Sequence, residues 1–67
     1  MKMNNFKSIE NVGYINVDNI TYISDVFQRV TDTWEFNIHF TDGAILPITT
    51  DSKGKSESII RYLIEKH

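Results

Sequence analysis

The sequence predicts a single α+β domain over residues 1–67, with an antiparallel four-stranded meander sheet and one C-terminal helix packed on one face. Two patterns lead to this fold class. The segment "WEFNIHF" (34–40) alternates strictly between apolar and polar residues, which is typical of a half-buried strand. From about Lys55 the apolar residues instead recur at helical spacing. A chain of 67 residues without cysteine is long enough for one domain only, and it has no disulfide to stabilise it.

The first expected strand is "GYINVD" (13–18), in which Ile15 and Val17 share one face. The preceding residues, 1–11, are mostly polar, and they predict either an N-terminal arm or a short extra strand. The sequence does not decide between the arm and the strand.

The second expected strand is "ITYISDVFQRV" (20–30), but its apolar residues do not keep to one side. Ile23 and Phe27 fall on one face of a regular strand. The apolar residues on the opposite face are Ile20, Tyr22 and Val26. The pattern therefore predicts a bulge or a twist inside this strand, at a position that the sequence leaves open.

The third strand, residues 34–40, is followed by Thr41-Asp42-Gly43, which is a hairpin signal. A three-residue loop with Gly43 in the left-handed conformation brings apolar side chains together across the two strands, whereas a two-residue loop does not. The resulting pairs are Phe40 with Ala44, Ile38 with Leu46, and Phe36 with Ile48. Pro47 then points to the other face and has no amide hydrogen, so the fourth strand lies at an edge or is bulged there.

The closing helix is predicted from about Lys55 to the end of the chain. Its apolar stripe consists of Ile59, Ile60, Leu63 and Ile64. Ser52 or Ser56 caps its N-terminus, where Glu57 favours the positive end of the helix dipole. A helix of this length does not persist alone, so its stripe is expected to lie on the sheet.

Lys53-Gly54-Lys55-Ser56 stands between a strand and a helix, which is the layout of a nucleotide-binding P-loop. That motif needs a glycine five positions before Gly54, and Thr49 stands there. We therefore expect a solvated loop before a helix cap rather than a nucleotide site. A weaker alternative is an anion held by Lys53, Lys55 and the helix N-terminus.

Glu35, Asn37 and His39 form a polar row along one face of the third strand, and glutamate and histidine are common catalytic and metal-binding residues. Residues four apart on a strand lie about 13 Å apart, so Glu35 and His39 cannot share one ion without help from neighbouring strands. No cysteine is present to act as a nucleophile. We expect no catalytic residue, no metal and no cofactor, and hence a protein that is not an enzyme.

The formal charge of −2 leaves no electrostatic footprint for a nucleic-acid backbone. The N-terminal residues lack the apolar core of a signal peptide, and no stretch approaches the roughly 20 apolar residues of a membrane span. A cytoplasmic protein without membrane contact is the expectation.

The expected sheet is wider than its helix, because four strands span about 20 Å and one helix is about 10–12 Å across. Part of the apolar face therefore stays exposed, and exposed apolar patches mark partner surfaces. We expect a homodimer or higher homo-oligomer, most simply a two-fold dimer. The expected self-association residues are Tyr22, Phe27, Trp34, Phe36 and Phe40. Further apolar surface is expected on the opposite face from Tyr14, Tyr22, Val26 and Ile45. In the alternative, the N-terminal arm covers the strip within one chain.

Two segments resemble known families. "INVDNITYI" (15–23) is similar to the strand-turn-strand opening of LytTR-type DNA-binding domains. "FTDGAILPI" (40–48) and the closing Ile-rich helix resemble the small flagellar and swarming-associated FlbD-like family. The order of four strands and then a helix is also similar to that of single-strand-binding coactivator dimers. These resemblances imply a small regulatory protein, with nucleic acid as the less favoured class of partner.

The favoured hypothesis is a small non-enzymatic interaction or regulatory module that acts through protein–protein contacts and self-associates. A phage-type regulator or antagonist of a host protein would fit its size and acidity. The alternative is a nucleic-acid-binding protein that uses cationic side chains with Tyr or Trp stacking. The expected anion or nucleic-acid contacts are Arg29, Lys53, Lys55 and Arg61.

Overall fold

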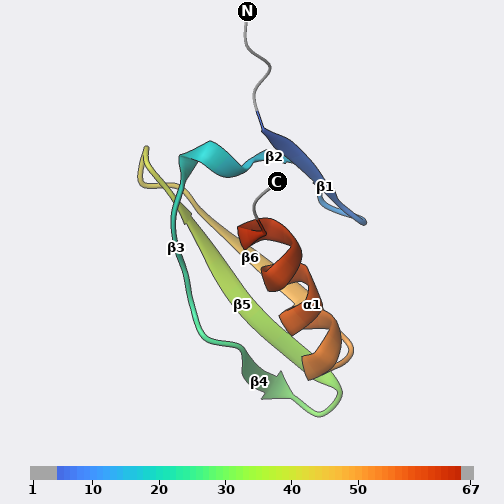
Figure 1. Cartoon of the computed structure of the whole chain (residues 1–67). Helices are drawn as coiled ribbons and strands as arrows, with labels where there is room; N and C mark the ends of the chain where they lie inside the picture. Colours follow the sequence, from blue (N-terminus) through green and yellow to red (C-terminus); the bar gives the residue numbers. More distant parts are fainter. Residues whose placement is uncertain (1–4, 66–67) are drawn as a thin grey trace, which may run out of the picture.

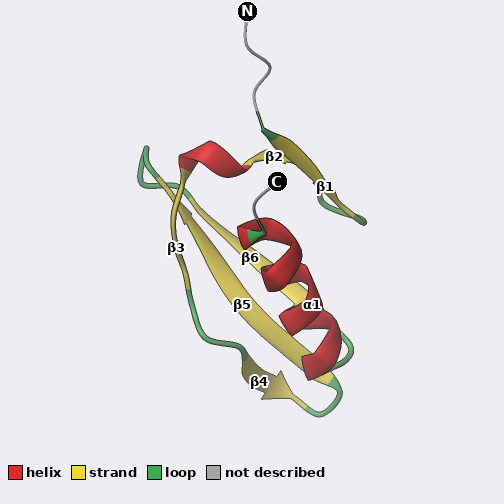
Figure 2. Cartoon of the chain, viewed as in Figure 1, coloured by secondary structure: helices red, strands yellow, loops and turns green. Residues whose placement is uncertain are grey.

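The computed structural model describes residues 5–65 of the chain. Among these residues there are six strands and one α-helix, arranged as shown in Figures 1 and 2. The elements are β1 (Phe6–Ile9), β2 (Gly13–Asn16), a 3₁₀ turn (Val17–Asn19), β3 (Ile20–Ile23), β4 (Phe27–Val30), β5 (Thr33–Phe40), β6 (Ile45–Thr50) and α1 (Lys53–Ile64). The predicted α+β class, with a C-terminal helix packed against an antiparallel sheet, is confirmed.

The sheet topology differs from the predicted meander. β1 and β2 form a separate two-stranded hairpin, so the expected arm region contains a short strand. The main sheet has β5 at its centre, with β6 along one edge and with β3 and β4 along the other. The expected strand 13–18 therefore pairs with the N-terminal residues and stays outside the main sheet. It also ends at Asn16, whose side chain accepts a hydrogen bond from the Asp18 amide and caps the 3₁₀ turn.

The expected strand 20–30 is divided into β3 and β4 by residues 24–26. Ser24 continues the pairing at the break: its amide donates to the Asn37 carbonyl at 2.9 Å, and its hydroxyl accepts from the Asn37 amide at 2.8 Å. The serine side chain thus takes the place of a backbone carbonyl in the ladder. The register also shifts between Ile20 and Tyr22.

These two irregularities correct the predicted faces of this segment. Ile20, Ile23 and Val26 all pack against the core, although a regular strand would separate Ile23 from the other two. Phe27 pairs with Glu35 and lies on the opposite face. Because strand side chains alternate with a period of two, a short break decides the face on which each following residue emerges.

The β5–β6 hairpin has the predicted three-residue loop. The Phe40 amide donates to the Ala44 carbonyl at 2.9 Å, and the Gly43 amide donates to the Phe40 carbonyl at 2.9 Å. Gly43 has φ of 89°, in the left-handed region. The predicted partners across the strands are also observed, with Phe36 opposite Ile48 and Ile38 opposite Leu46. β6 lies at an edge of the sheet with Pro47 opposite Asn37, as predicted.

Helix α1 begins after Ser52, whose Oγ accepts a hydrogen bond from the Lys55 amide at 3.1 Å. Ser52, and not Ser56, is therefore the cap. Ser56 is fully buried, and its hydroxyl lies 2.7 Å from Thr50 Oγ1. The predicted apolar stripe is wrong at its end, because Ile64 is 61% exposed while Leu63 is buried. The four apolar residues are spread over a wider part of the helix circumference than the sheet and the hairpin cover, so Ile64 is left in solvent.

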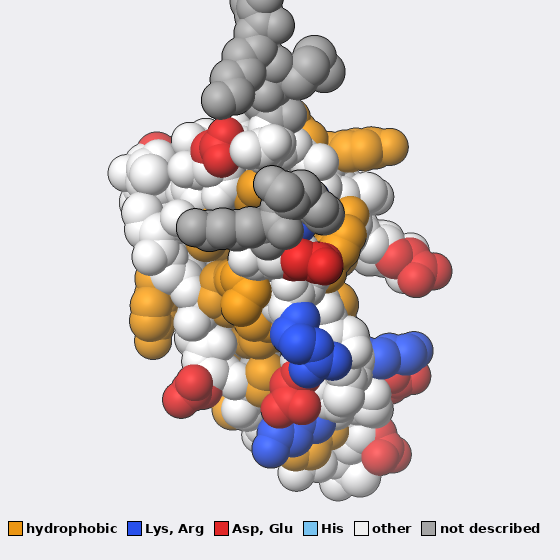
Figure 3. Space-filling model, in the orientation of Figure 1, with side chains coloured by type: hydrophobic (Ala, Val, Ile, Leu, Met, Phe, Trp, Pro, Cys, Tyr) orange, Lys and Arg blue, Asp and Glu red, His pale blue; other side chains and the backbone are white. Residues whose placement is uncertain are grey.

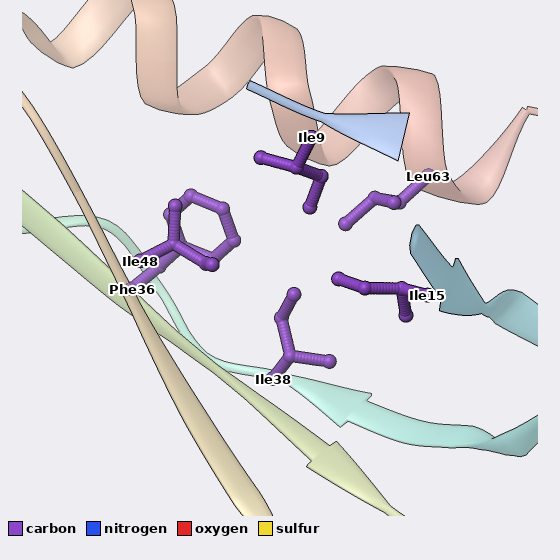
Figure 4. Packing of buried hydrophobic residues seen from close by; sticks show 6 residues of the cluster. All are labelled: Ile9, Ile15, Phe36, Ile38, Ile48 and Leu63. Atoms are coloured by element: carbon purple, nitrogen blue, oxygen red, sulfur yellow. The ribbon is translucent and has the colours of Figure 1, made fainter. Parts of the chain in front are cut away.

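The core lies between the sheet, the helix and the β1–β2 hairpin. Its buried members are Ile9, Ile15, Phe36, Ile38, Ile48 and Leu63, and Figure 4 shows them converging from these elements. Ile9 and Ile15 come from the hairpin, which covers apolar sheet surface that the helix leaves open. Within the expected arm, residues 1–11, Ile9 is buried in the same cluster as Phe36, whereas Trp34 and Phe40 of the expected strip stay half-buried.

Candidate interaction surface

The sheet has one covered face and one face on which no element of residues 5–65 packs. Helix α1 contacts β5 and β6, and the buried core residues of β5 all alternate toward it. The opposite side chains form what we call the open face. Read from the strand register, its members are Tyr22, Phe27, Glu35, Asn37, His39, Ile45, Pro47 and Thr49.

Strand pairing orders the open face into transverse rows. Tyr22, His39 and Ile45 form one row across β3, β5 and β6. A second row crosses β4, β5 and β6 and consists of Phe27, Glu35 and Thr49. Asn37 and Pro47 lie between the two rows. Residues two apart on a strand are about 7 Å apart, so the patch extends for about 13 Å along β5.

Apolar side chains stand at the margins of this patch and polar ones along its middle. Tyr22 is 58% exposed, Ile45 is 57% exposed and Phe27 is 41% exposed. The Tyr22 ring meets the His39 ring edge-on, with 5.0 Å between the ring centroids. Each row thus has at least one large apolar side chain in contact with solvent, which a folded monomer gains nothing by exposing.

The charge on the open face is paired within the chain. Glu35 is buried, and its carboxylate accepts a hydrogen bond from Arg29 Nη1 at 3.0 Å. The Arg29 side chain remains 63% exposed. Because the carboxylate already has a cationic partner, a second surface could approach Glu35 without leaving an unpaired buried charge.

The expected self-association residues divide between the two faces. Phe36 is fully buried in the core and cannot contact a partner, so its assignment to that surface is wrong. Trp34 and Phe40 are half-buried on the core side of β5. Tyr22 and Phe27 belong to the open face. The alternation in β5 does signal that Phe36 is inward, but the covering hairpin is not visible in the sequence pattern.

The four residues expected to add surface on the opposite face are also divided. Tyr22 and Ile45 lie on the open face. Val26 packs against the core instead, at the end of the break formed by residues 24–26. Tyr14 is 78% exposed but stands on the outer side of the β1–β2 hairpin, opposite Ser8. Pro47 also lies on the open face, because the register of the β5–β6 hairpin sets it opposite Asn37.

The four expected cationic contacts do not gather into one site. Arg29 is paired with Glu35 on the open face, and Lys55 is paired with Asp51 at 3.2 Å. Lys53 Nζ lies 6.0 Å from the centroid of the Trp34 ring. Arg61 donates to Ser58 Oγ at 3.4 Å. Figure 3 shows the helix side with Lys and Arg side chains interspersed with Asp and Glu, which disperses the positive potential that a phosphate backbone would need.

Within residues 5–65 no group of three or more His, Asp or Glu side chains is placed to hold a metal ion. In the same part of the chain, no helix has both the length and the apolar character needed to cross a bilayer. Comparison with protein-family models, with curated proteins and with solved structures finds no match for this chain. The resemblances to LytTR-type domains and to the FlbD-like family stay predictions.

Proposed function

We propose that this chain is a non-enzymatic interaction module that associates with itself through the open face of its sheet. The supporting observation is the exposure of Tyr22, Phe27 and Ile45 on a face that no other element of the described chain covers. A domain of this size buries only about 60% of its unfolded surface, and association is a common way to bury more.

A two-fold arrangement suits this surface. In an isologous dimer each residue of the patch is used twice, so a few apolar side chains contribute to a larger interface. The ion pair between Arg29 and Glu35 forms within one chain, so the centre of the face brings little net charge to a second copy. The exposed Tyr22 ring is held by its contact with His39, which lowers the entropy lost when a partner orders it.

The test is the oligomeric state in solution. Sedimentation of the full chain over a range of concentrations is expected to show a species of twice the 7.8 kDa chain mass. Replacing Tyr22 with serine should raise the dissociation constant by roughly 100-fold or more, because two apolar side chains per dimer each lose about 1.5 kcal/mol of burial.

Tyr14→Ser is the matched control, since Tyr14 is the more exposed tyrosine but lies on the hairpin away from the open face. We expect this variant to associate as the unchanged chain does. A monomer at every concentration would rule out the proposal, and an equal loss in both variants would rule out the open face as the interface.

Binding to nucleic acid is the competing function, and the geometry favours it less because two of the four cations are already paired with carboxylates. A single-stranded oligonucleotide that binds with an affinity falling steeply as salt rises would support the competing function. If no oligonucleotide binds at low salt, the competing function is ruled out.

A further inference from the structure

A groove of about 1240 Å³ borders residues 47–50 of β6, a strand that among residues 5–65 pairs with β5 alone and so has a free edge. Consecutive residues 47–52 line one side of it. Helix α1 forms the second side, and the tip of the β1–β2 hairpin closes one end. Figure 1 shows β6, α1 and this hairpin tip on the same side of the molecule.

The backbone groups that face the groove can be identified from the ladder. Phe40 donates to Ala44, so these two residues form a hydrogen-bonded pair between β5 and β6. Such pairs alternate with non-bonded pairs along an antiparallel ladder. Asn37, in a non-bonded pair with Pro47, accordingly exchanges its hydrogen bonds with Ser24 on the other side of β5. On β6 the outward-facing residues are therefore Ile45, Pro47 and Thr49.

Pro47 removes the middle donor from this edge. An added strand could accept only from the Ile45 and Thr49 amides, and of these two residues only Thr49 lines the groove. The Pro47 and Thr49 carbonyls remain as acceptors. A proline on an edge strand discourages pairing with other strands in general. Because this edge offers one donor and two acceptors, an added strand can form all three hydrogen bonds in one register only.

The walls add apolar and charged contacts. Val12 on the hairpin tip is 42% exposed and Tyr62 on α1 is 41% exposed, and both line the groove. The charged lining residues are the acidic Glu10, Asp32, Asp51 and Glu57 and the basic Lys55 and Arg61. Lys55 is paired with Asp51, so acidic side chains exceed basic ones among the rest.

We propose that this groove binds an extended peptide segment of another protein, which adds as a strand to β6 and carries lysine or arginine between apolar residues. Main-chain hydrogen bonds give such complexes affinity, and the alternate side chains give specificity. A second copy of this chain fits the groove poorly, because pairing two β6 edges would bring the same acidic walls together. Self-association uses the side chains of the open face, including those of Pro47 and Thr49, whereas this inference rests on the outward backbone groups of the same two residues.

A displayed library of random linear peptides, selected against the full chain, tests this proposal. We expect enriched peptides to alternate apolar residues with lysine or arginine, and to shift the amide resonances of residues 47–52 when synthesised and titrated. Failure to enrich any peptide, or enrichment of acidic ones, would overturn the proposal.

Two pairs of variants locate the site. Thr49→Pro removes the groove's outward amide and should weaken binding of the selected peptide by roughly tenfold or more, whereas Ile45→Pro removes the outward amide that lies outside the groove and should not. Circular dichroism tests whether each variant is folded. If Thr49→Pro does not fold, the charge pair decides: Glu57→Lys should weaken binding of a lysine-bearing peptide, and Asp25→Lys, outside the groove, should not. Equal binding by Glu57→Lys and Asp25→Lys would contradict the site.

Discussion

At the scale of single residues, the buried carboxylate of Glu35 is the most demanding feature of the described sheet. Its exposed fraction is 7%, and burial of a charged group is costly unless the group is paired and hydrogen-bonded. Arg29 supplies both functions through the contact between its Nη1 and Glu35 Oε1. The guanidinium itself remains in solvent, which limits the strength of the pair because water screens the exposed partner.

Replacing Arg29 with methionine should lower the free energy of unfolding by about 1 kcal/mol, because it leaves the Glu35 carboxylate without a cation. The same change in a Glu35→Gln background should cost less, since a neutral amide has less need of that partner. Urea unfolding of the single and double variants measures the difference. Equal costs in both backgrounds would show that the two side chains do not interact.

At the scale of elements, the chain uses glycine in two opposite ways. Gly43 needs its positive φ of 89° to close the β5–β6 hairpin, although a side chain there would meet no neighbouring atom. Gly54 lies in the first turn of α1, has no positive φ and also has open space around it. The backbone conformation, and not crowding, therefore separates the two positions.

This difference gives a matched pair of alanine substitutions. Gly43→Ala should destabilise the chain by about 1 kcal/mol, because the left-handed conformation strains a residue with a Cβ atom. Gly54→Ala should stabilise it by roughly 0.5–1 kcal/mol, because alanine loses less backbone entropy in a helix. Thermal unfolding of both variants checks the opposite signs, and a stabilising Gly43→Ala would contradict the loop conformation.

At the scale of the whole molecule, the β1–β2 hairpin is a separate sheet that must be held to the rest of the chain. Ile9 and Ile15 insert into the core, and Lys7 binds the end of the helix. The Lys7 ammonium donates to the carbonyls of Tyr62 and Glu65, and it lies 4.9 Å from the centroid of the Tyr62 ring. A cation at a helix C-terminus also interacts favourably with the helix dipole.

Lys7→Met should therefore lower the free energy of unfolding by about 1 kcal/mol and loosen the hairpin more than the main sheet. Amide hydrogen exchange is expected to speed up in β1 and β2 before it does in β5. Lys53→Met is the control, since Lys53 lies farther from its ring, at 6.0 Å, and its loss should change stability little. Uniform acceleration across all strands would contradict a role specific to the hairpin.

The sequence alone determined the features that depend on neighbouring residues. Alternation in residues 34–40 and the Thr41-Asp42-Gly43 signal were sufficient for β5, the loop length and the β5–β6 register. The helix followed from the spacing of its apolar residues, and the sequence offered Ser52 or Ser56 as its cap, of which the structure uses Ser52. These elements are set by short-range steric and hydrogen-bonding rules, which a linear pattern records.

Tertiary structure decided everything that depends on distant partners. β2 pairs with β1, and Ile15 of this hairpin is buried in the same cluster as Phe36. The sequence could not predict this packing, because the apolar side of a hairpin does not reveal which sheet it will cover. The break at Ser24 likewise becomes visible only through its hydrogen bonds to Asn37, which is 13 positions away. Burial is a sum over contacts that the whole fold brings together, and it therefore selected which of the apolar residues remain exposed for a partner.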